Sequence, residues 1–284
     1  MIVRATVAGG LLEASDDGPR EAASVVLLHG FTGSRTTWSR LVRRFATSRR
    51  MIAIDLPGHG RSDARSGNFD DTVHAIATIA ETIVSVPAAW IGYSLGGRLA
   101  LAMALARPDL VERLLLESAS PGIADDDERI ARRRDDDALA ERIERDGVEA
   151  FVDHWECLPL FATLRGLPPA ERDALRRQRL GCSSRGLAAS LRTVGGGRQP
   201  WLGDRLGEIV VPVTLVAGGE DAKYRAIAAA MAARIPRSAL EIVGGTGHAP
   251  HLERTDAFEA IVDRFLSAPS TIRSPDRVHE GEAP

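Results

Sequence analysis

Residues 88–106 read AAWIGYSLGGRLALAMALA, and this stretch decides the fold of the chain. The apolar run Ala88–Ile91 is typical of a buried strand, and the residues after the turn have the apolar spacing of a helix. Between them stands the pattern G-x-S-x-G, which in a strand–turn–helix context is typical of a nucleophilic serine. Side chains at Gly92 and Gly96 would collide with the flanking strand and helix, and so tight a turn strains the serine backbone. We therefore predict that Ser94 is a nucleophile at the carboxyl end of a sheet.

Two backbone amides beside Ser94 are predicted to stabilise negative charge. The N–H of Leu95 lies at the N-terminus of the helix that follows the turn, where the amide dipoles favour an anion. The N–H of Phe31 comes just after an earlier apolar strand that ends at His29. Together the two amides would form an oxyanion hole. His29 itself, and His59 in a later turn, are expected to have structural roles.

Strand and helix patterns alternate along much of the chain. Short apolar runs that suit buried parallel strands occur at Val25–Leu28, Met51–Ile54, Ala88–Ile91, Leu114–Leu116, Val211–Ala217 and Leu240–Val243. Apolar residues at helical spacing occur at Trp38–Phe45, Thr72–Val84, Arg98–Ala106, Tyr224–Ile235 and Asp256–Leu266. This alternation predicts an α/β fold with a mostly parallel central sheet and helices on both of its faces.

The alternation stops between about Ala119 and Pro200. That stretch has no convincing buried strand, but it carries charge-dense helical patterns at Asp125–Glu144, Gly147–Trp155, Pro168–Arg179 and Arg185–Val194. We expect residues 119–200 to be a helical cap inserted into a core made of residues 1–118 and 201–268. Residues 269–284 are polar, contain proline and lack periodicity, so a disordered tail is expected there.

The acid and the base of a catalytic triad are expected late in the chain. In this arrangement the acid follows the G-x-S-x-G serine, and the histidine comes last. Asp221 lies just past a strand end, where it would fix the tautomer of His248 and stabilise the imidazolium ion. Glu220 and Glu117 are competing acids. His251 competes with His248 as the base, but it is expected to pack against the last helix.

Composition narrows the classes of function. Of the 284 residues 44% are hydrophobic, and the net charge of −3 argues against a nucleic-acid partner or an acidic membrane surface. Cys157 and Cys182 are interpreted as free thiols in a reducing compartment. The N-terminus lacks the apolar segment of a secretory signal, and no apolar run approaches the ~18 residues needed to cross a bilayer. We expect a cytoplasmic protein without membrane insertion, either a monomer or a small homo-oligomer.

Motifs over about Val25–Leu266 carry a more specific resemblance. They read GYSLGGR (92–98), ESASPG (117–122), RRRDDD (132–137), FVDHW (151–155), PLF (159–161), GLAASLR (186–192), GEDAKY (219–224) and GHAPHLE (247–253). In these motifs the chain resembles the 2-succinyl-6-hydroxy-2,4-cyclohexadiene-1-carboxylate synthases, α/β-hydrolase-fold enzymes of menaquinone (vitamin K2) biosynthesis. It departs at Tyr224, where Phe is common, and at Leu95, where Met is common; neither departure is expected to touch the chemistry.

The resemblance implies a lyase rather than a hydrolase. Members of the family eliminate pyruvate from 2-succinyl-5-enolpyruvyl-6-hydroxy-3-cyclohexene-1-carboxylate, with an activated Ser–His pair removing a ring proton. No cofactor and no metal is implied. A carboxylesterase or a carbon–carbon bond hydrolase of the same fold stays an alternative, and so does a receptor-like scaffold without catalysis.

A substrate with three carboxylates needs several fixed cations. Arg98 lies on the first helical turn after Ser94, where a guanidinium can pair with a carboxylate through two hydrogen bonds but gives a neutral ester nothing. The resemblance adds as substrate-binding positions Tyr93, Arg132 or Arg133, Trp155, Arg179 and Lys223.

Lys223 stands out by composition. It is the only lysine among 36 basic residues, an excess of arginine that a GC-rich genome explains. At a position where any cation would serve, arginine would be expected. A compact ammonium is therefore predicted to be needed at Lys223, either to steady the loop of Asp221 or to face a substrate carboxylate.

Overall fold

A sheet of eight strands organises the computed structural model, which describes residues 1–84 and 87–269. Its order is β1-β2-β4-β3-β5-β6-β7-β8, in which the pairs β1–β2 and β2–β4 are antiparallel and the other neighbouring pairs are parallel. The bounds are β1 Ile2–Val7, β2 Gly10–Asp17, β3 Ser24–Leu28, β4 Arg50–Ile54, β5 Ala88–Tyr93, β6 Val111–Glu117, β7 Val213–Gly218 and β8 Ser238–Val243. The predicted α/β fold with a mostly parallel sheet is confirmed. The tail expected over 269–284 lies, except for Pro269, outside the described residues.

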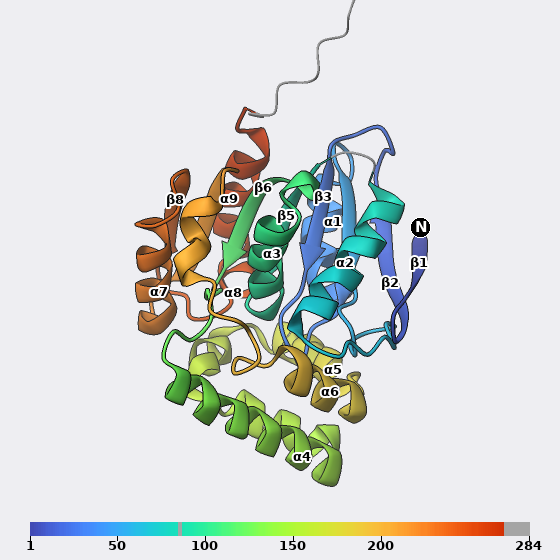
Figure 1. Ribbon diagram of the computed structural model, residues 1–284, viewed down its shortest axis with the longest axis vertical. Coiled ribbons are helices and arrows are strands. Elements are labelled where there is room, and N and C mark those ends of the chain that lie inside the picture. The colour runs from blue at the N-terminus through green and yellow to red at the C-terminus, as the bar shows by residue number, and fades with distance from the viewer. Residues whose placement is uncertain (85–86, 270–284) are drawn as a thin grey trace, which may run out of the picture.

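Helices cover both faces of this sheet (Figure 1). They are α1 Ser39–Phe45, α2 Phe69–Ile83, α3 Leu95–Ala106, α7 Ala222–Ala232, the short α8 Pro250–Glu253 and α9 Thr255–Ser267. Successive residues of a strand point to opposite faces, so Val26 and Leu28 join the core under α2, α3 and α7. Val25 and Leu27 join the second core, under α1 and α9. The apolar runs of the sequence are therefore strands buried on both sides.

The hairpin β1–β2 was not foreseen. Its strands carry charged residues that are nevertheless buried, because Glu13 pairs with Arg4 and Arg35, and Asp16 pairs with Arg50. Because charged residues take positions that face the interior, these strands lack the alternation of polar and apolar residues by which a half-buried strand is recognised.

A helical layer lies beyond the carboxyl ends of the parallel strands, at the bottom of Figure 1. It consists of α4 Asp126–Glu156, the 3-10 segment η3 Pro159–Gly166, α5 Pro169–Leu180 and α6 Ser184–Val194. The two helices expected before η3 are both present within α4, because the helical backbone is interrupted at Gly147, whose φ is 85° and ψ is 171°. The segment between β6 and β7 contains no strand, as expected, and all of it is described. The layer has its own apolar cluster, in which α4 packs on α6.

Candidate active site

The turn between β5 and α3 forces Ser94 into an unusual backbone conformation. Its φ is 49° and its ψ is −109°, a region that residues with a side chain rarely adopt. A Cβ added at Gly92 would overlap the backbone of Gly96, and a Cβ added at Gly96 would overlap the carbonyl oxygen of Leu28. The two glycines are therefore sterically required where the sequence pattern predicted, and they present Ser94 at the end of β5.

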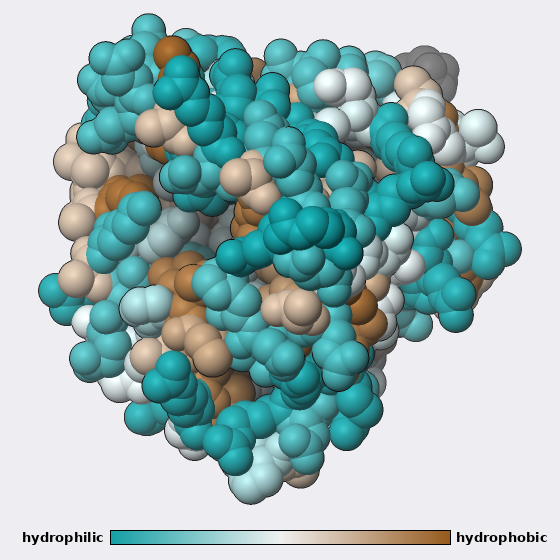
Figure 2. All heavy atoms as spheres, turned by 90° about the horizontal axis from the view of Figure 1, so that it is seen from below, coloured by the Kyte–Doolittle hydropathy of each residue, from teal (hydrophilic) through white to brown (hydrophobic). Residues whose placement is uncertain are grey.

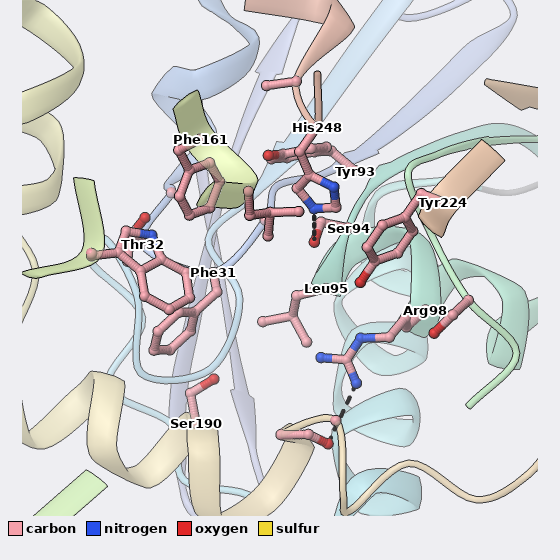
Figure 3. A pocket seen from close by; sticks show the side chains of 18 of the residues that line it. Phe31, Thr32, Tyr93, Ser94, Leu95, Arg98, Phe161, Ser190, Tyr224 and His248 are labelled. Carbon is pink, nitrogen blue, oxygen red and sulfur yellow. Dashed lines mark hydrogen bonds between the residues drawn. The ribbon is translucent and has the colours of Figure 1, made fainter. Parts of the chain in front are cut away.

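Three side chains from separate turns meet at this point, and Figure 3 shows two of them, Ser94 and His248. His248 Nδ1 lies 2.8 Å from Asp221 Oδ2, and His248 Nε2 lies 3.1 Å from Ser94 Oγ. A carboxylate only accepts hydrogen bonds, so Nδ1–H donates to Asp221 and Nε2 is left to accept the Ser94 hydroxyl. Asp221 and His248 are both buried. This arrangement can move a proton away from the serine oxygen.

The competing residues occupy other positions. Glu220 is exposed to solvent. Glu117 is fully buried and pairs instead with His251, whose backbone N–H and Nδ1 each lie 2.9 Å from Glu117 Oε1. The ring of His251 packs against Phe258 of α9, with centroids 6.0 Å apart, as the sequence predicted. A second buried acid–histidine pair therefore stands beside Ser94 without contacting it through the imidazole.

The two turn histidines are buried among apolar and backbone groups. His29 Nε2 accepts a hydrogen bond from the N–H of Leu56 at 3.1 Å, and His59 Nδ1 lies 3.0 Å from the carbonyl of Pro57. Burial lowers the pKa of His29 to about 4 and that of His59 to about 3. Both rings are therefore neutral at physiological pH and hold loops in place.

Glu253 was missed by the sequence analysis. Its carboxylate accepts hydrogen bonds from the N–H of Gly247, at 2.9 Å, and from the N–H of Ala249, at 3.2 Å. These amides stand immediately before and after His248, in a buried loop where each would otherwise lack a partner. The one signal for Glu253 in the sequence was its position, as an acidic residue five positions after the histidine of the predicted triad.

A cavity of about 410 Å³ opens at Ser94, between the sheet edge and the helical layer. Leu95 and Phe31, the two residues predicted to supply the oxyanion-hole amides, both line it. The ring of Phe31 packs against Trp155 of α4 at a centroid distance of 5.4 Å, which joins the core to the layer. On the face seen in Figure 2 the surface is mainly hydrophilic, with apolar residues visible in the recesses.

Arg98 is a cation in this wall without an acidic partner. Its Nη2 donates to the carbonyl of Val194 at 2.9 Å, and its Nη1 donates to Gln199 Oε1 at 3.2 Å. Within residues 1–84 and 87–269 no carboxylate lies at ion-pair distance from it. Burial lowers the pKa of Arg98 to about 10. A partly buried guanidinium whose hydrogen-bond partners are neutral keeps its charge available to an anionic ligand in the cavity.

The other predicted cations differ in their surroundings. Arg132 lines the cavity and pairs with Asp136 at 2.8 Å. Arg179 lines it too, is buried, and pairs with Glu156 at 3.0 Å, while its Nε makes no hydrogen bond to any described residue. Arg133 donates to the carbonyl of Gly197 and is not among the residues that line the cavity.

The remaining predicted residues also reach the cavity. Lys223 is exposed at its rim, with Nζ 5.9 Å from the ring centroid of Tyr224. The indole N–H of Trp155 is buried and makes no hydrogen bond in the described structure. Tyr93 packs on His248 with ring centroids 5.6 Å apart, and burial raises the pKa of its hydroxyl well above the usual value. These side chains add donors and apolar surface around Ser94.

Two further observations bear on ligands. No group of three or more His, Cys, Asp or Glu side chains within the described ranges is placed to hold a metal ion. No helix in that part of the chain is both long and apolar enough to span a membrane.

Comparisons with known proteins agree with this geometry. The model of the alpha/beta hydrolase family matches residues 25–261. A protein of Bacillus subtilis (strain 168), named provisionally as a 2-succinyl-6-hydroxy-2,4-cyclohexadiene-1-carboxylate synthase, is 41% identical over 94% of this chain and 98% of its own length. The synthase of that name from Serratia proteamaculans (strain 568) is 32% identical over 89% of this chain and 96% of its own. The solved structure of MenH from S. aureus is 36% identical, with a TM-score of 0.86 over 90% of this chain and 97% of that one.

Proposed function

The chain belongs to the alpha/beta hydrolase family and, within it, to the 2-succinyl-6-hydroxy-2,4-cyclohexadiene-1-carboxylate synthases, and we propose how its residues carry out that reaction. The enzyme is a lyase of menaquinone biosynthesis that acts on a small molecule. Its substrate would be 2-succinyl-5-enolpyruvyl-6-hydroxy-3-cyclohexene-1-carboxylate, from which pyruvate is eliminated.

Ser94, His248 and Asp221 act as the catalytic triad. His248 takes the hydroxyl proton of Ser94 as the serine oxygen takes a proton from the substrate ring. The carbon–oxygen bond to the enolpyruvyl group then breaks, and the released enolpyruvate takes up a proton to become pyruvate. Asp221 holds Nδ1–H and stabilises the imidazolium that carries the proton meanwhile. The N–H groups of Phe31 and Leu95 face the negative charge that develops beside Ser94.

The observation that carries this proposal is Arg98, a partly buried guanidinium that pairs with no acid among the described residues and lines the same cavity as Ser94. A carboxylate bound there restores the stabilisation that the guanidinium loses on burial. Arg132, Arg179 and Lys223 supply further positive charge to the other carboxylates of the substrate, and Tyr93 and Trp155 pack on its ring. A neutral ester would leave Arg98 uncompensated.

The helical layer acts as a cap over this chemistry. We assign the cap to residues 119–200 and the core to residues 1–118 and 201–268, because the cavity is lined by both. The protein works in the cytoplasm, as a monomer or a small homo-oligomer; Cys157 and Cys182 form no disulfide.

The test is pyruvate release from the enolpyruvyl substrate. The wild-type protein should release pyruvate, and Ser94→Ala should abolish the release without unfolding, because the Ser94 side chain lines the cavity and is not part of the apolar core. His248→Ala should lose comparable activity, and His251→Ala should lose less. Hydrolysis of p-nitrophenyl acetate without pyruvate release would instead identify an esterase. Greater damage from His251→Ala than from His248→Ala would overturn the choice of base.

A further inference from the structure

Tyr224 is tied to the triad through its backbone and its ring. It lies in the first turn of α7, and its N–H donates to Asp221 Oδ1 at 3.1 Å, the oxygen that His248 does not use. The tyrosine ring packs on the imidazole of His248, with centroids 4.5 Å apart. The position of this ring is therefore fixed relative to the reacting atoms.

The hydroxyl of Tyr224 faces the cavity. Figure 3 shows it pointing away from the imidazole and toward Arg98, on the same side as Ser94. Tyr224 lines the cavity, yet its hydroxyl makes no hydrogen bond within the described residues. Burial raises the pKa of this hydroxyl above its usual value, so at neutral pH it is an O–H donor. An unpartnered donor beside an unpaired cation is suited to an anion.

The hydrogen-bond partners of Arg98 among the described residues are all neutral, so its charge is available to such a ligand. Its guanidinium donates hydrogen bonds to the carbonyl oxygens of Val194 and Gly195 and to the side-chain oxygen of Gln199. A carboxylate has two oxygens with about four acceptor sites, so one oxygen can take the guanidinium and the other can take a hydroxyl. We infer that the Tyr224 hydroxyl donates a hydrogen bond to the substrate carboxylate that pairs with Arg98, which makes Tyr224 a specificity-determining residue. The inference rests on the proposed function and adds a residue to it.

The test variant is Tyr224→Phe, which keeps the ring on His248 and removes only the hydroxyl. KM for the enolpyruvyl substrate should rise about tenfold or more, the usual effect of losing a hydrogen bond to a charged group. The rate at which a fluorophosphonate labels Ser94 should stay at the wild-type value, because that probe carries no carboxylate. An unchanged KM overturns the inference. Slower labelling would also overturn it, because the tyrosine would then act by placing His248.

A double-mutant cycle identifies the partner. If Tyr224 and Arg98 hold the same carboxylate, Tyr224→Phe should cost much less in an Arg98→Ala background than in the wild-type protein. If the two substitutions instead raise KM by independent factors that multiply in the double variant, the hydroxyl contacts a different group and the pairing is refuted.

Failure of the proposed function can be told apart from failure of this inference. Succinate should protect Ser94 from fluorophosphonate labelling, and Tyr224→Phe should weaken that protection. If the wild-type protein releases no pyruvate while this protection pattern holds, the lyase assignment fails and the carboxylate contact stands. If pyruvate is released but protection and KM are unaffected in Tyr224→Phe, the contact fails alone.

Discussion

Replacing Arg98 by alanine removes the cation on which the choice between a polycarboxylate and a neutral ester depends. A pKa of about 10 in place of 12.5 means that the site disfavours the charged guanidinium by about 3 kcal/mol. A bound carboxylate must offset that cost, and truncating one partner of a buried charge pair typically costs about 2–5 kcal/mol. We therefore expect Arg98→Ala to lower kcat/KM for pyruvate release by about 3 kcal/mol, a factor on the order of 100.

The assay follows pyruvate by coupled NADH oxidation, normalised to the fraction of protein that a fluorophosphonate labels. Arg98→Lys should recover part of the loss, since an ammonium keeps the charge but not the two parallel hydrogen bonds. Arg264→Ala is the matched control, because Arg264 is an exposed arginine that pairs with Glu241 outside the cavity. Wild-type kcat/KM in Arg98→Ala would refute the reasoning and favour a neutral substrate.

Three further predictions concern residues around the triad and the core. Lys223→Arg should clearly lower pyruvate release, because a guanidinium is bulkier than the ammonium at the cavity rim. Arg145→Lys on the exposed part of α4 is the control and should change nothing, and wild-type activity in both variants would show that Lys223 has no special role. Glu253→Gln leaves one acceptor oxygen for the amides of Gly247 and Ala249, so kcat and the rate of Ser94 labelling should fall while KM stays unchanged. Glu241→Gln on the surface is the control, and a normal labelling rate in Glu253→Gln would disprove that Glu253 positions the His248 loop. His59 is neutral in the fold down to about pH 3, and His29 down to about pH 4, but each takes up a proton near pH 6.5 when unfolded, so each should lower the free energy of unfolding by about 1.4 kcal/mol per pH unit below pH 6.5. Replacing His59 by asparagine should remove about half of their joint slope above pH 4, measured from unfolding at a series of pH values, and an unaltered slope would contradict the assignment.

The strands that build the active edge were readable because their surroundings are simple. Parallel strands that are buried on both faces, such as β3 and β5, are almost continuously apolar and can be recognised by that. A serine between two glycines directly after such a strand is typical of a nucleophile. Once the serine was identified, the known chain order of serine, acid and histidine predicted where the acid and the histidine would lie. Chemistry that depends on local backbone geometry is therefore visible in the sequence.

Features set by tertiary contacts were not readable. The hairpin β1–β2 was missed because buried Glu13 and Asp16 are neutralised by arginines far away in the chain. The packing of the Tyr224 ring on His248 is another such contact, because it joins residues 24 positions apart in the chain. Arg132 and Arg133 are adjacent in sequence, and only the helix orientation distinguishes the one that lines the cavity.

The backbone of Ser94 also has a consequence for protein engineering. A serine at φ 49° carries a conformational cost on the order of 1–3 kcal/mol, which a glycine at the same place would largely avoid. Heat tolerance and catalysis therefore pull in opposite directions at this position. A selection for thermal survival alone would be expected to discard the nucleophile, so a library screened for heat resistance needs an activity filter at Ser94 from its first round.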